Sequence, residues 1–584
     1  MRAALDRILA LVVAEGRRAA DAYMSCAPAQ TAPAKAEFVV VSSLAEGADR
    51  LIAEAGLAAG FTLDAVLPFH RDDYVLDFET EDSRVAYQDL LQRAAAVFEI
   101  DGQRTDGPHA YEAAGLIMLA NTDLLIVVWD GNLAAGIGGT AQIISRAVSD
   151  GVPIVWIEPA APEVLHLSWA QAGEILSADA HARPHETFRL ADEATLARAV
   201  REILAPPTRP EALSALTEYL HTKEPRWNFC PWYSLLAWLF AGRPLSREDF
   251  RMPPAVADTR QRWSDYLSIL PGDRSQRPAI ENILLPACGV ADHLANFYSL
   301  VYRSTYIVNF LFASLAVGIA LNGVFIHEPR EKGYFVVLEL VFIVMILLTW
   351  LHGHRHQWHR RWLECRRLAE CLRQLRFFAP LGSAGVVERP RPGLGTEEDW
   401  INWYAWTVRR QLPLPDRAID RPYLESVRDV VLNAEVYDQI RYHERNSARM
   451  HKLDHRLHLS GLVLFGATAA LCLAFVLLVW LGALDDLAAE PRNIILSSLT
   501  FLTALLPTLG ASLAAIHAQG EFRTLADQST RTAKRLGAIS KIIAAEEPSF
   551  ARMVDRVEKT SDVLMAELRE WHTIFRTRPL ALPA

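Results

Sequence analysis

The sequence predicts a protein in two parts: an N-terminal α/β domain built on a doubly wound parallel sheet, and an α-helical transmembrane domain with four spans. Two observations lead to this fold class. Over roughly the first 205 residues, short apolar strand patterns alternate with helical patterns, which is typical of a parallel sheet with helices on both faces. After residue 300, the chain holds four apolar runs that are each long enough, or nearly so, to cross a bilayer.

Composition bounds the class of protein. The length of 584 residues exceeds one ordinary domain. The formal net charge of -10, without any dense basic arm, argues against a nucleic-acid binder. The six cysteines are scattered without a C-x-x-C pair, so neither a disulfide framework nor a zinc site is expected. The mean hydropathy of +0.10 is high for a soluble protein, and the apolar residues responsible lie mainly after residue 300.

Strands and helices are expected in alternation through the α/β part. Asp6 and Glu15 interrupt the apolar side of the first helix, so it is not expected to be a secretory signal. Short runs rich in Val and Ile are expected as buried strands, and longer segments with helical periodicity as helices. The expected strands are 37–41, 61–67, 97–100, 124–129 and 152–156, and the expected helices are 1–24, 50–59, 83–96, 109–120, 141–149 and 195–204.

A glycine-rich loop follows the fourth expected strand, which ends at Asp130. Glycines between a parallel strand and a helix let backbone N–H groups approach a ligand, and the helix N-terminus carries partial positive charge. The loop therefore predicts a phosphate-bearing ligand, with an ordinary tight turn as the alternative. The residues that we expect to bind it are Asp130, Gly136, Gly138, Gly139 and Thr140.

A second loop of this kind follows the first strand and is expected at the carboxyl edge of the sheet, where ligands bind. Its candidate ligand-binding residues are Ser42, Ser43, Glu46, Gly47 and Asp49. The polar loop after the strand 61–67 adds Arg71, which could pair with a phosphate; the alternative is a solvated loop.

These motifs resemble the SLOG superfamily. The resemblance rests on SSLAEGADRLIAEAGL, on the proline-ended strand with FHRDDY, and on TDLLIVVWDG followed by GGTAQ, and it covers about residues 37–159. The superfamily contains the LOG nucleotide phosphoribohydrolases, the DNA-processing Smf/DprA proteins and nucleotide sensors of bacterial conflict systems. The resemblance implies a Rossmann-like domain that binds a nucleotide-derived molecule.

One departure from the hydrolase members bears on catalysis. Those members carry a PGGxGTxxE loop whose glutamate is catalytic, and alignment on Gly139 and Thr140 puts Ile143 at that position. An alkyl group cannot act as a general base. Glu46 or Asp130 could substitute in principle, but nothing in the sequence shows that either does. We therefore expect a binding domain rather than an enzyme, with no catalytic residue, resident cofactor or metal assigned.

The segment 206–303 is harder to interpret. Prolines mark a linker at its start, and the aromatic stretch 227–240 is too short to span a bilayer. Trp and Tyr favour the membrane interface, so the stretch is expected to be an interfacial or domain-docking segment. A buried helix of a small linking domain is an equal alternative.

The four apolar runs are 306–326, 334–351, 459–481 and 494–516, and their short connections pair them into two hairpins. Arginine-rich segments follow the second run, precede the third and follow the fourth. The positive-inside rule places all three segments, and hence both termini, in the cytoplasm. We expect a multi-pass protein of a bacterial inner membrane.

The amphipathic helices after each hairpin suggest an internal repeat. Tandem hairpins with such helices resemble SLATT two-span modules, which occur beside SLOG domains and are thought to make membrane pores. The resemblance implies a homo-oligomer. The expected divisions are the SLOG-like domain (1–205), the linker and interfacial region (206–303), the first hairpin (304–380), a helical connector (381–450), the second hairpin (451–545) and the C-terminal helix and tail (546–584).

Polar residues within the spans are candidates for function. Glu339 and Asn322 are expected at similar depths in the second and first spans, where they would line a polar vestibule of an oligomer. The alternative is a glutamate that reaches the headgroups. Histidines at the cytoplasmic edges (His352, His356, His359, His451, His455 and His458) have spacing that could hold a metal, but interfacial polar residues are the more common reading.

Three functions remain open from the sequence. The first is a sensor–effector in which a nucleotide-derived signal gates or oligomerises a pore in bacterial antiphage or conflict defence. The second is a membrane-tethered nucleoside-phosphate hydrolase of the LOG type. The third is a non-enzymatic membrane scaffold with a degenerate nucleotide fold.

Overall fold

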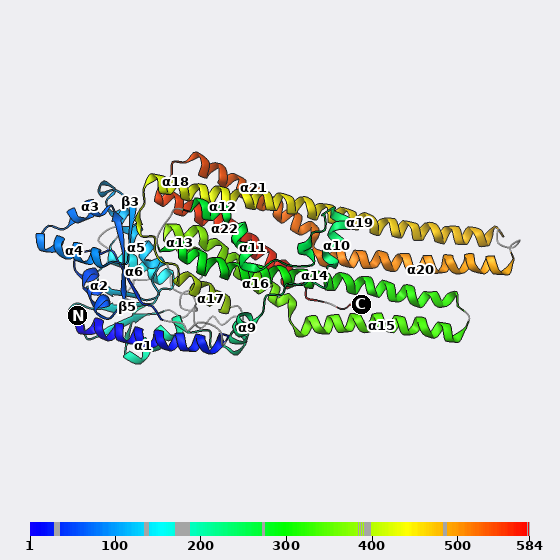
Figure 1. Ribbon diagram of the computed structural model, residues 1–584, viewed down its shortest axis with the longest axis horizontal. Coiled ribbons are helices and arrows are strands. Elements are labelled where there is room, and N and C mark those ends of the chain that lie inside the picture. Colours follow the sequence, from blue (N-terminus) through cyan, green and yellow to red (C-terminus); the bar gives the residue numbers. More distant parts are fainter. Residues whose placement is uncertain are drawn as a thin grey trace.

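The computed structural model gives an elongated molecule with the α/β domain at one end and two helical hairpins protruding at the other (Figure 1). A helical body lies between them. The structure describes every residue except 29–35, 133–138, 170–186, 271–274, 327, 384, 386, 388, 390–398, 483–487, 581, 583 and 584.

All five expected strands are present, but they form two hydrogen-bonded sheets rather than one. The first sheet has the order β1-β2-β3-β8, and its strands are parallel. In the second sheet, β4 and β5 are parallel, whereas β6 and β7, which the sequence did not indicate, add in antiparallel orientation. The bounds are β1 Val39–Ser42, β2 Thr62–Phe69, β3 Ala96–Gly102, β4 Leu125–Val128, β5 Ile154–Ile157, β6 Leu165–Ser168, β7 Arg189–Ala191 and β8 Arg417–Ala418.

Helices cover both faces of this strand layer, which makes this part of the chain an α/β domain. Successive side chains of a strand point to opposite faces. Ile126 and Val128 of β4 pack into the cluster formed with α1, α2, α4 and α8, whereas Val127 packs against α6. The helices are α1 Arg2–Cys26, α2 Ala48–Ala58, α3 Arg71–Tyr74, α4 Glu81–Arg93, α5 Pro108–Ala120, α6 Thr140–Ser149 and α8 Glu193–Leu204.

Strand β8 comes from the connector, far along the chain, and joins the α/β domain to the helical body. The backbone N–H of Ile419 donates to the carbonyl oxygen of Glu99 at 2.7 Å, and Asp416 Oδ1 accepts from the N–H of Val97 at 3.0 Å. On the neighbouring helix α17 (Asp399–Arg410), Arg410 pairs with Asp123 at 3.0 Å. The two parts therefore share one packed boundary.

The two hairpins repeat the same path. In each repeat, a long helix leaves the body, a second helix returns, and a third packs back on the first. Each third helix starts after a residue in the left-handed region, Gln357 (φ 48) and Glu521 (φ 48), and neither is glycine. This shared break supports the expected internal repeat. The helices are α14 Leu285–Leu321, α15 Pro329–Arg355 and α16 Trp358–Phe378, then α19 Tyr437–Trp480, α20 Ala489–Gly520 and α21 Phe522–Ala545.

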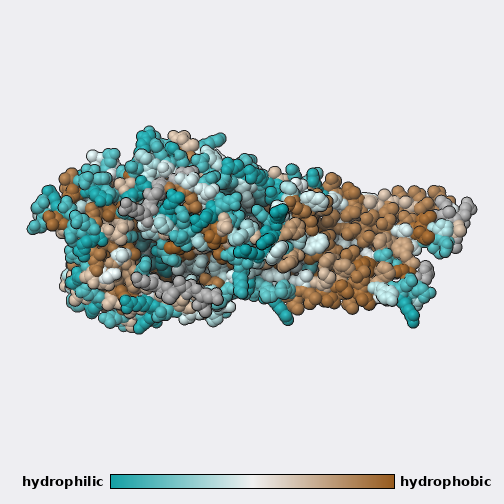
Figure 2. Space-filling model, viewed as in Figure 1, coloured by the Kyte–Doolittle hydropathy of each residue, from teal (hydrophilic) through white to brown (hydrophobic). Residues whose placement is uncertain are grey.

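The structure confirms four helices that are long and apolar enough to cross a membrane, which are the protruding parts of α14, α15, α19 and α20. Their hydrophobic surface is plain in Figure 2, with hydrophilic residues toward the outer tips. They pack in the order α15, α14, α20, α19, so that α15 and α19 lie at the two ends of a row. Within the described residues, such a row encloses no lumen.

Shorter helices complete the body, and one long helix, α22, closes it. Pi-helical segments at Ile280–Leu284 and Val430–Val436 precede α14 and α19. The remaining helices are α9 Pro210–His221, α10 Trp232–Ala241, α11 Ala255–Arg262, α12 Ser264–Ile269, α13 Gln276–Ala279, α18 Arg421–Asp429 and α22 Phe550–Arg576.

A buried ionic cluster lies inside the helical body. Glu370 of α16 pairs with Arg366 at 2.7 Å and with Arg373, while Arg376 pairs with Glu435. His443 of α19 is buried beside this cluster, where burial and, next, the charge of Arg366 lower its pKa to about 4. The folded protein thus holds this imidazole neutral.

Replacement of His443 by Gln is expected to flatten the acid side of the stability profile. The pKa of His443 is about 4 in the folded state and about 6.5 when unfolded, so the unfolded state binds the extra proton between these values. Wild-type stability therefore falls as pH drops from about 6.5 to 4. Melting temperatures across this range check the prediction, and parallel profiles for wild type and variant would contradict it.

Candidate functional site

The loop between β1 and α2 is a compact turn at the carboxyl end of β1. The Ser43 hydroxyl donates to Asp49 Oδ2 at 2.6 Å, and the Ser42 hydroxyl oxygen accepts from the N–H of Leu44 at 3.1 Å. Gly47 has φ 103, a conformation that other residues rarely adopt. Burial raises the pKa of Asp49 despite the Ser43 bond. Glu46 and Gly47 are exposed. The two serines and Asp49 instead form hydrogen bonds within the loop and fix its conformation.

Arg50 is a residue of this loop that the sequence analysis missed. Its guanidinium donates to the carbonyl oxygen of Leu44 at 3.0 Å and to Ser83 Oγ at 2.9 Å, and it lies 4.2 Å from the centre of the Phe78 ring. It is buried, so it fixes the loop against α4. Its place in the first turn of α2, directly after the loop, was the available sign.

Arg71 is not free to meet a phosphate in this structure. Its side chain pairs with the buried carboxylate of Glu99 through Nε at 2.8 Å, and its backbone N–H donates to the same carboxylate at 2.8 Å. This pairing raises the pKa of Arg71. The side chain remains partly exposed, but its charge is paired with Glu99.

The glycine-rich loop ends in an open helix N-terminus. Gly139 is the N-cap of α6 with φ -79 and ψ 161, and it offers no side-chain cap to the first turn. Thr140 is exposed. Asp130 accepts from the backbone N–H and the amide of Asn132, and these bonds lower its pKa. Two further candidates, Gly136 and Gly138, lie outside the described residues. The uncapped N–H groups of α6 suit an anion.

The first turn of α5 connects the two loops. The Tyr111 ring lies 5.7 Å from that of Phe69 at the end of β2 and 6.5 Å from that of Tyr74. The next residue, Glu112, accepts from the Gln142 amide of α6 at 2.6 Å. Tyr74 also lies within reach of the Ser43 side chain of the β1–α2 loop. The end of β2, with the β1–α2 loop beyond Tyr74, and the start of α6 therefore lie on either side of one helix end.

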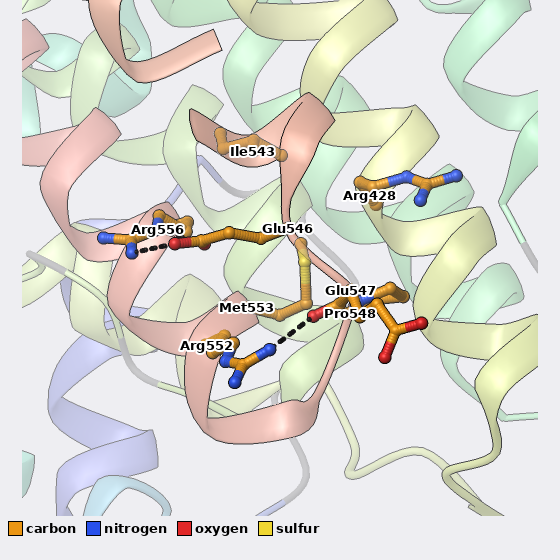
Figure 3. Close-up of a pocket in the computed structure, with 8 residues that line it drawn as sticks. All are labelled: Arg428, Ile543, Glu546, Glu547, Pro548, Arg552, Met553 and Arg556. Carbon is orange, nitrogen blue, oxygen red and sulfur yellow. Dashed lines mark hydrogen bonds and ion pairs between the residues drawn. The ribbon is translucent and has the colours of Figure 1, made fainter. Parts of the chain in front are cut away.

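This edge also touches the last long helix of the chain. The carboxylate of Asp101, at the end of β3, accepts the backbone N–H of Phe550 at 2.9 Å and so caps the first turn of α22. Beside it, the turn between α21 and α22 encloses a hollow of about 10 Å³, bordered by Glu546, whose carboxylate pairs with Arg556 (Figure 3). That volume suits one water rather than a nucleotide.

Helix α22 runs from the α/β domain to the base of the protruding hairpins (Figure 1). Its 27 residues correspond to a length of about 40 Å. Near its end, the Trp571 ring packs edge-on against Trp362 of α16, with ring centres 4.9 Å apart. Just beyond it, the Gln519 amide of α20 donates to the carbonyl oxygen of Arg578 at 3.3 Å, and the Trp350 indole of α15 donates to that of Leu580 at 3.2 Å.

The polar span residues named from the sequence are not joined to each other. Asn322 donates to the carbonyl oxygen of Gly318 in its own helix at 2.8 Å, and Glu339 is half-buried on α15. The structure instead joins polar residues that the sequence analysis missed. These contacts are Thr349 to Asn309 at 2.7 Å between α15 and α14, and Ser314 to Ser512 at 2.6 Å between α14 and α20.

No protein-family model matches the chain, and no curated protein or solved structure is detectably similar to it. Among the described residues, no group of three or more His, Cys, Asp or Glu side chains is placed to hold a metal ion. The features that remain are an anion-suited helix start, a shaped loop beside it, and a helix that leads to the hairpins.

Proposed function

We propose that the protein is a membrane-bound sensor–effector of the SLOG–SLATT type. A nucleotide-derived anion binds at the carboxyl edge of the α/β domain, on the α6 N-terminus and beside the β1–α2 loop. Binding is transmitted through α22 to the four apolar helices, which open a pore or damage the membrane. The setting is bacterial antiphage or conflict defence, with both termini on the cytoplasmic side of the inner membrane.

The observation that carries this proposal is the path of α22. Its first turn is capped by Asp101 at the carboxyl edge, and Trp571 near its end packs against α16. The tail just beyond the helix contacts α20 at Arg578 and α15 at Leu580. Along the way, burial raises the pKa of Glu558 of α22, and the positive charge of Arg146 on α6 opposes that rise. A ligand that shifts α6 or the end of β3 therefore acts on a rigid element that also contacts the spans. Coupling of this kind requires the ligand to bind the open arrangement more tightly than the closed one.

The arrangement of the spans supports assembly of several copies. A single chain places its four apolar helices in a row, with α15 and α19 at the ends. Almost none of the apolar surface of α15, α19 and α20 is buried within the chain, whereas more than half of that of α14 is buried. A row of helices has no interior, so a water-filled path requires helices from more than one chain. The proposed effector is thus a homo-oligomer whose polar path includes Glu339.

A charge placed at the α6 N-cap tests the binding step. The variant Gly139→Asp puts a carboxylate where the phosphate is expected, and like charges this close cost several kcal/mol, so binding falls by at least tenfold. The matched variant Gly139→Asn has the same shape without the charge. Both side chains are favoured at an N-cap, so both variants should fold.

The measurement is the melting temperature of the full chain in detergent with AMP, ADP, ATP and cyclic mono- and dinucleotides. At least one nucleotide should stabilise the wild type and Gly139→Asn, but not Gly139→Asp. Equal losses in both variants, or no response from the wild type, would contradict the proposed site. Release of phosphate or base by the same samples would instead favour the hydrolase.

A further inference from the structure

Helix α10 lies at the level where the apolar helices begin. The backbone N–H of Tyr233, in its first turn, donates to Ser304 Oγ of α14 at 3.1 Å. At its other end, Arg456 of α19 donates to the carbonyl oxygen of Phe240 at 3.1 Å. Ser304 and Arg456 stand just before the apolar runs of their helices. Figure 1 shows α10 beside both helices where they leave the body. A membrane crossed by these helices has its surface at α10.

The segment from Arg226 to Arg251, here called the interfacial segment, exposes large apolar side chains. Phe229 is 90% exposed, Leu239 61%, Trp227 55% and Trp238 52%. The Trp227 and Phe229 rings stack on each other, with ring centres 6.5 Å apart. Adjacent exposed aromatic residues mark a binding surface rather than ordinary protein surface. Trp has an apolar body and a polar N–H, which suits the boundary between acyl chains and headgroups.

Hydrogen bonds hold the backbone of this segment in a defined conformation. Trp227 and Arg251 form an antiparallel bridge, and the backbone N–H of Asn228 donates to the carbonyl oxygen of Phe250 at 2.9 Å. The Asn228 side chain is buried and donates to the carbonyl oxygen of Asp249 at 2.9 Å. The Arg251 guanidinium lies 5.2 Å from the centre of the Trp227 ring. Trp227 and Arg251 are therefore held side by side on the surface.

The charge around these aromatic residues is mostly positive. Arg226, Arg247 and Arg251 are exposed, and none of them pairs with a carboxylate in the part of the chain that the structure describes. Asp249 is buried and bound to Arg243 at 2.8 Å, which leaves Glu248 as the exposed acid of the segment. Guanidinium groups form bidentate hydrogen bonds with phosphate oxygens.

We propose that the interfacial segment is a lipid-binding surface. Trp227, Phe229 and Trp238 insert into the leaflet next to the helical body, and the three exposed arginines bind the phosphates of anionic headgroups. The proposal depends on the four apolar helices crossing a membrane, but not on any nucleotide. Because α10 is bonded to both α14 and α19, one from each hairpin, lipid held there bears on both hairpins at once.

The depth of Trp238 tests the insertion. Full-length wild type and Trp238→Phe are placed in nanodiscs with brominated lipid, and the difference between their tryptophan emissions isolates Trp238. We expect bromine to quench this difference strongly. The control is Trp263→Phe, because Trp263 is buried in the helical body and its difference should not be quenched. A Trp238 difference that aqueous iodide quenches and bromolipid does not would overturn the proposal.

The headgroup contacts are tested with phosphatidylglycerol and phosphatidylcholine added to the full-length protein in detergent. The wild type should bind phosphatidylglycerol more tightly. Each arginine at an anionic surface strengthens binding about fivefold, so Arg247→Gln with Arg251→Gln should weaken it about 25-fold. The control pair Arg7→Gln and Arg17→Gln, exposed on α1, should change nothing. Equal binding of both lipids, or an equal response to inorganic phosphate, would overturn the headgroup assignment.

Discussion

Replacement of Arg376 by Met is expected to destabilise the helical body by about 3–5 kcal/mol, because it leaves the buried carboxylate of Glu435 without its main partner. Arg376 also donates to the carbonyl oxygen of Ala434 at 3.1 Å, and its guanidinium lies 5.2 Å from the centre of the Trp263 ring. The change removes all three contacts. Denaturant unfolding in detergent, followed by circular dichroism, measures the loss.

Two further variants separate the buried charge from general damage. Arg376→Met with Glu435→Leu removes both charges, and apolar replacement of a whole buried pair is often neutral, so most of the stability should return. Arg421→Met breaks an exposed pair with Glu425 and should cost less than about 1 kcal/mol. A double variant as unstable as the single one would show that the carboxylate is not the cause.

Replacement of Trp571 by Ala is expected to abolish nucleotide-triggered membrane permeability while leaving nucleotide binding intact. Trp571 is buried near the end of α22, where it packs on Trp362 and Phe575. Truncation of a buried Trp costs about 3–5 kcal/mol, enough to loosen this end of the helix. The α6 N-terminus lies in the α/β domain, at the other end of α22, so its anion affinity should not change. Dye release and nucleotide affinity are measured on the same preparations.

A matched control is available at the opposite end of the molecule. Trp480→Ala removes a tryptophan of α19 that is almost fully exposed near the outer tip, away from α22. It should release dye as the wild type does. If Trp571→Ala keeps its nucleotide response, α22 does not carry the coupling. If it loses nucleotide binding as well, the variant has damaged the domain rather than the connection.

The sequence predicted the elements whose signals are local. Periodicity gave the five strands and the four apolar helices, because alternation and run length depend on the residues themselves. Strand β8 was not predicted, because its two residues carry no periodic pattern and their pairing with β3 is decided by tertiary contacts. The division into two sheets was not predicted either, because it also depends on tertiary contacts. The short strand β6 pairs antiparallel with β5, and β7 pairs antiparallel with β6. The local sequence pattern does not determine where one hydrogen-bonded sheet ends and the next begins.

The candidate site was predicted by residue type but not by partner. Arg71 follows the end of a strand, where a phosphate ligand is expected, but its side chain forms an ion pair with Glu99. In the sequence, Glu99 is a single polar residue within a buried strand, so nothing marks it as the partner. The role of α22 was also hidden. Its amphipathic pattern marks a packed helix, but the cap from Asp101, 449 residues away along the chain, is a purely tertiary fact. The aromatic stretch 227–240 left two alternatives, and the lipid-binding surface proposed above is the membrane-interface alternative.

The most direct test of the coupling uses sealed liposomes that carry the purified full-length protein and a trapped dye. The nucleotide that stabilises the wild type is added, and its binding and the dye release are recorded in the same sample. The proposed mechanism predicts release that follows occupancy and is absent with Gly139→Asp. Saturated binding with no release would contradict it.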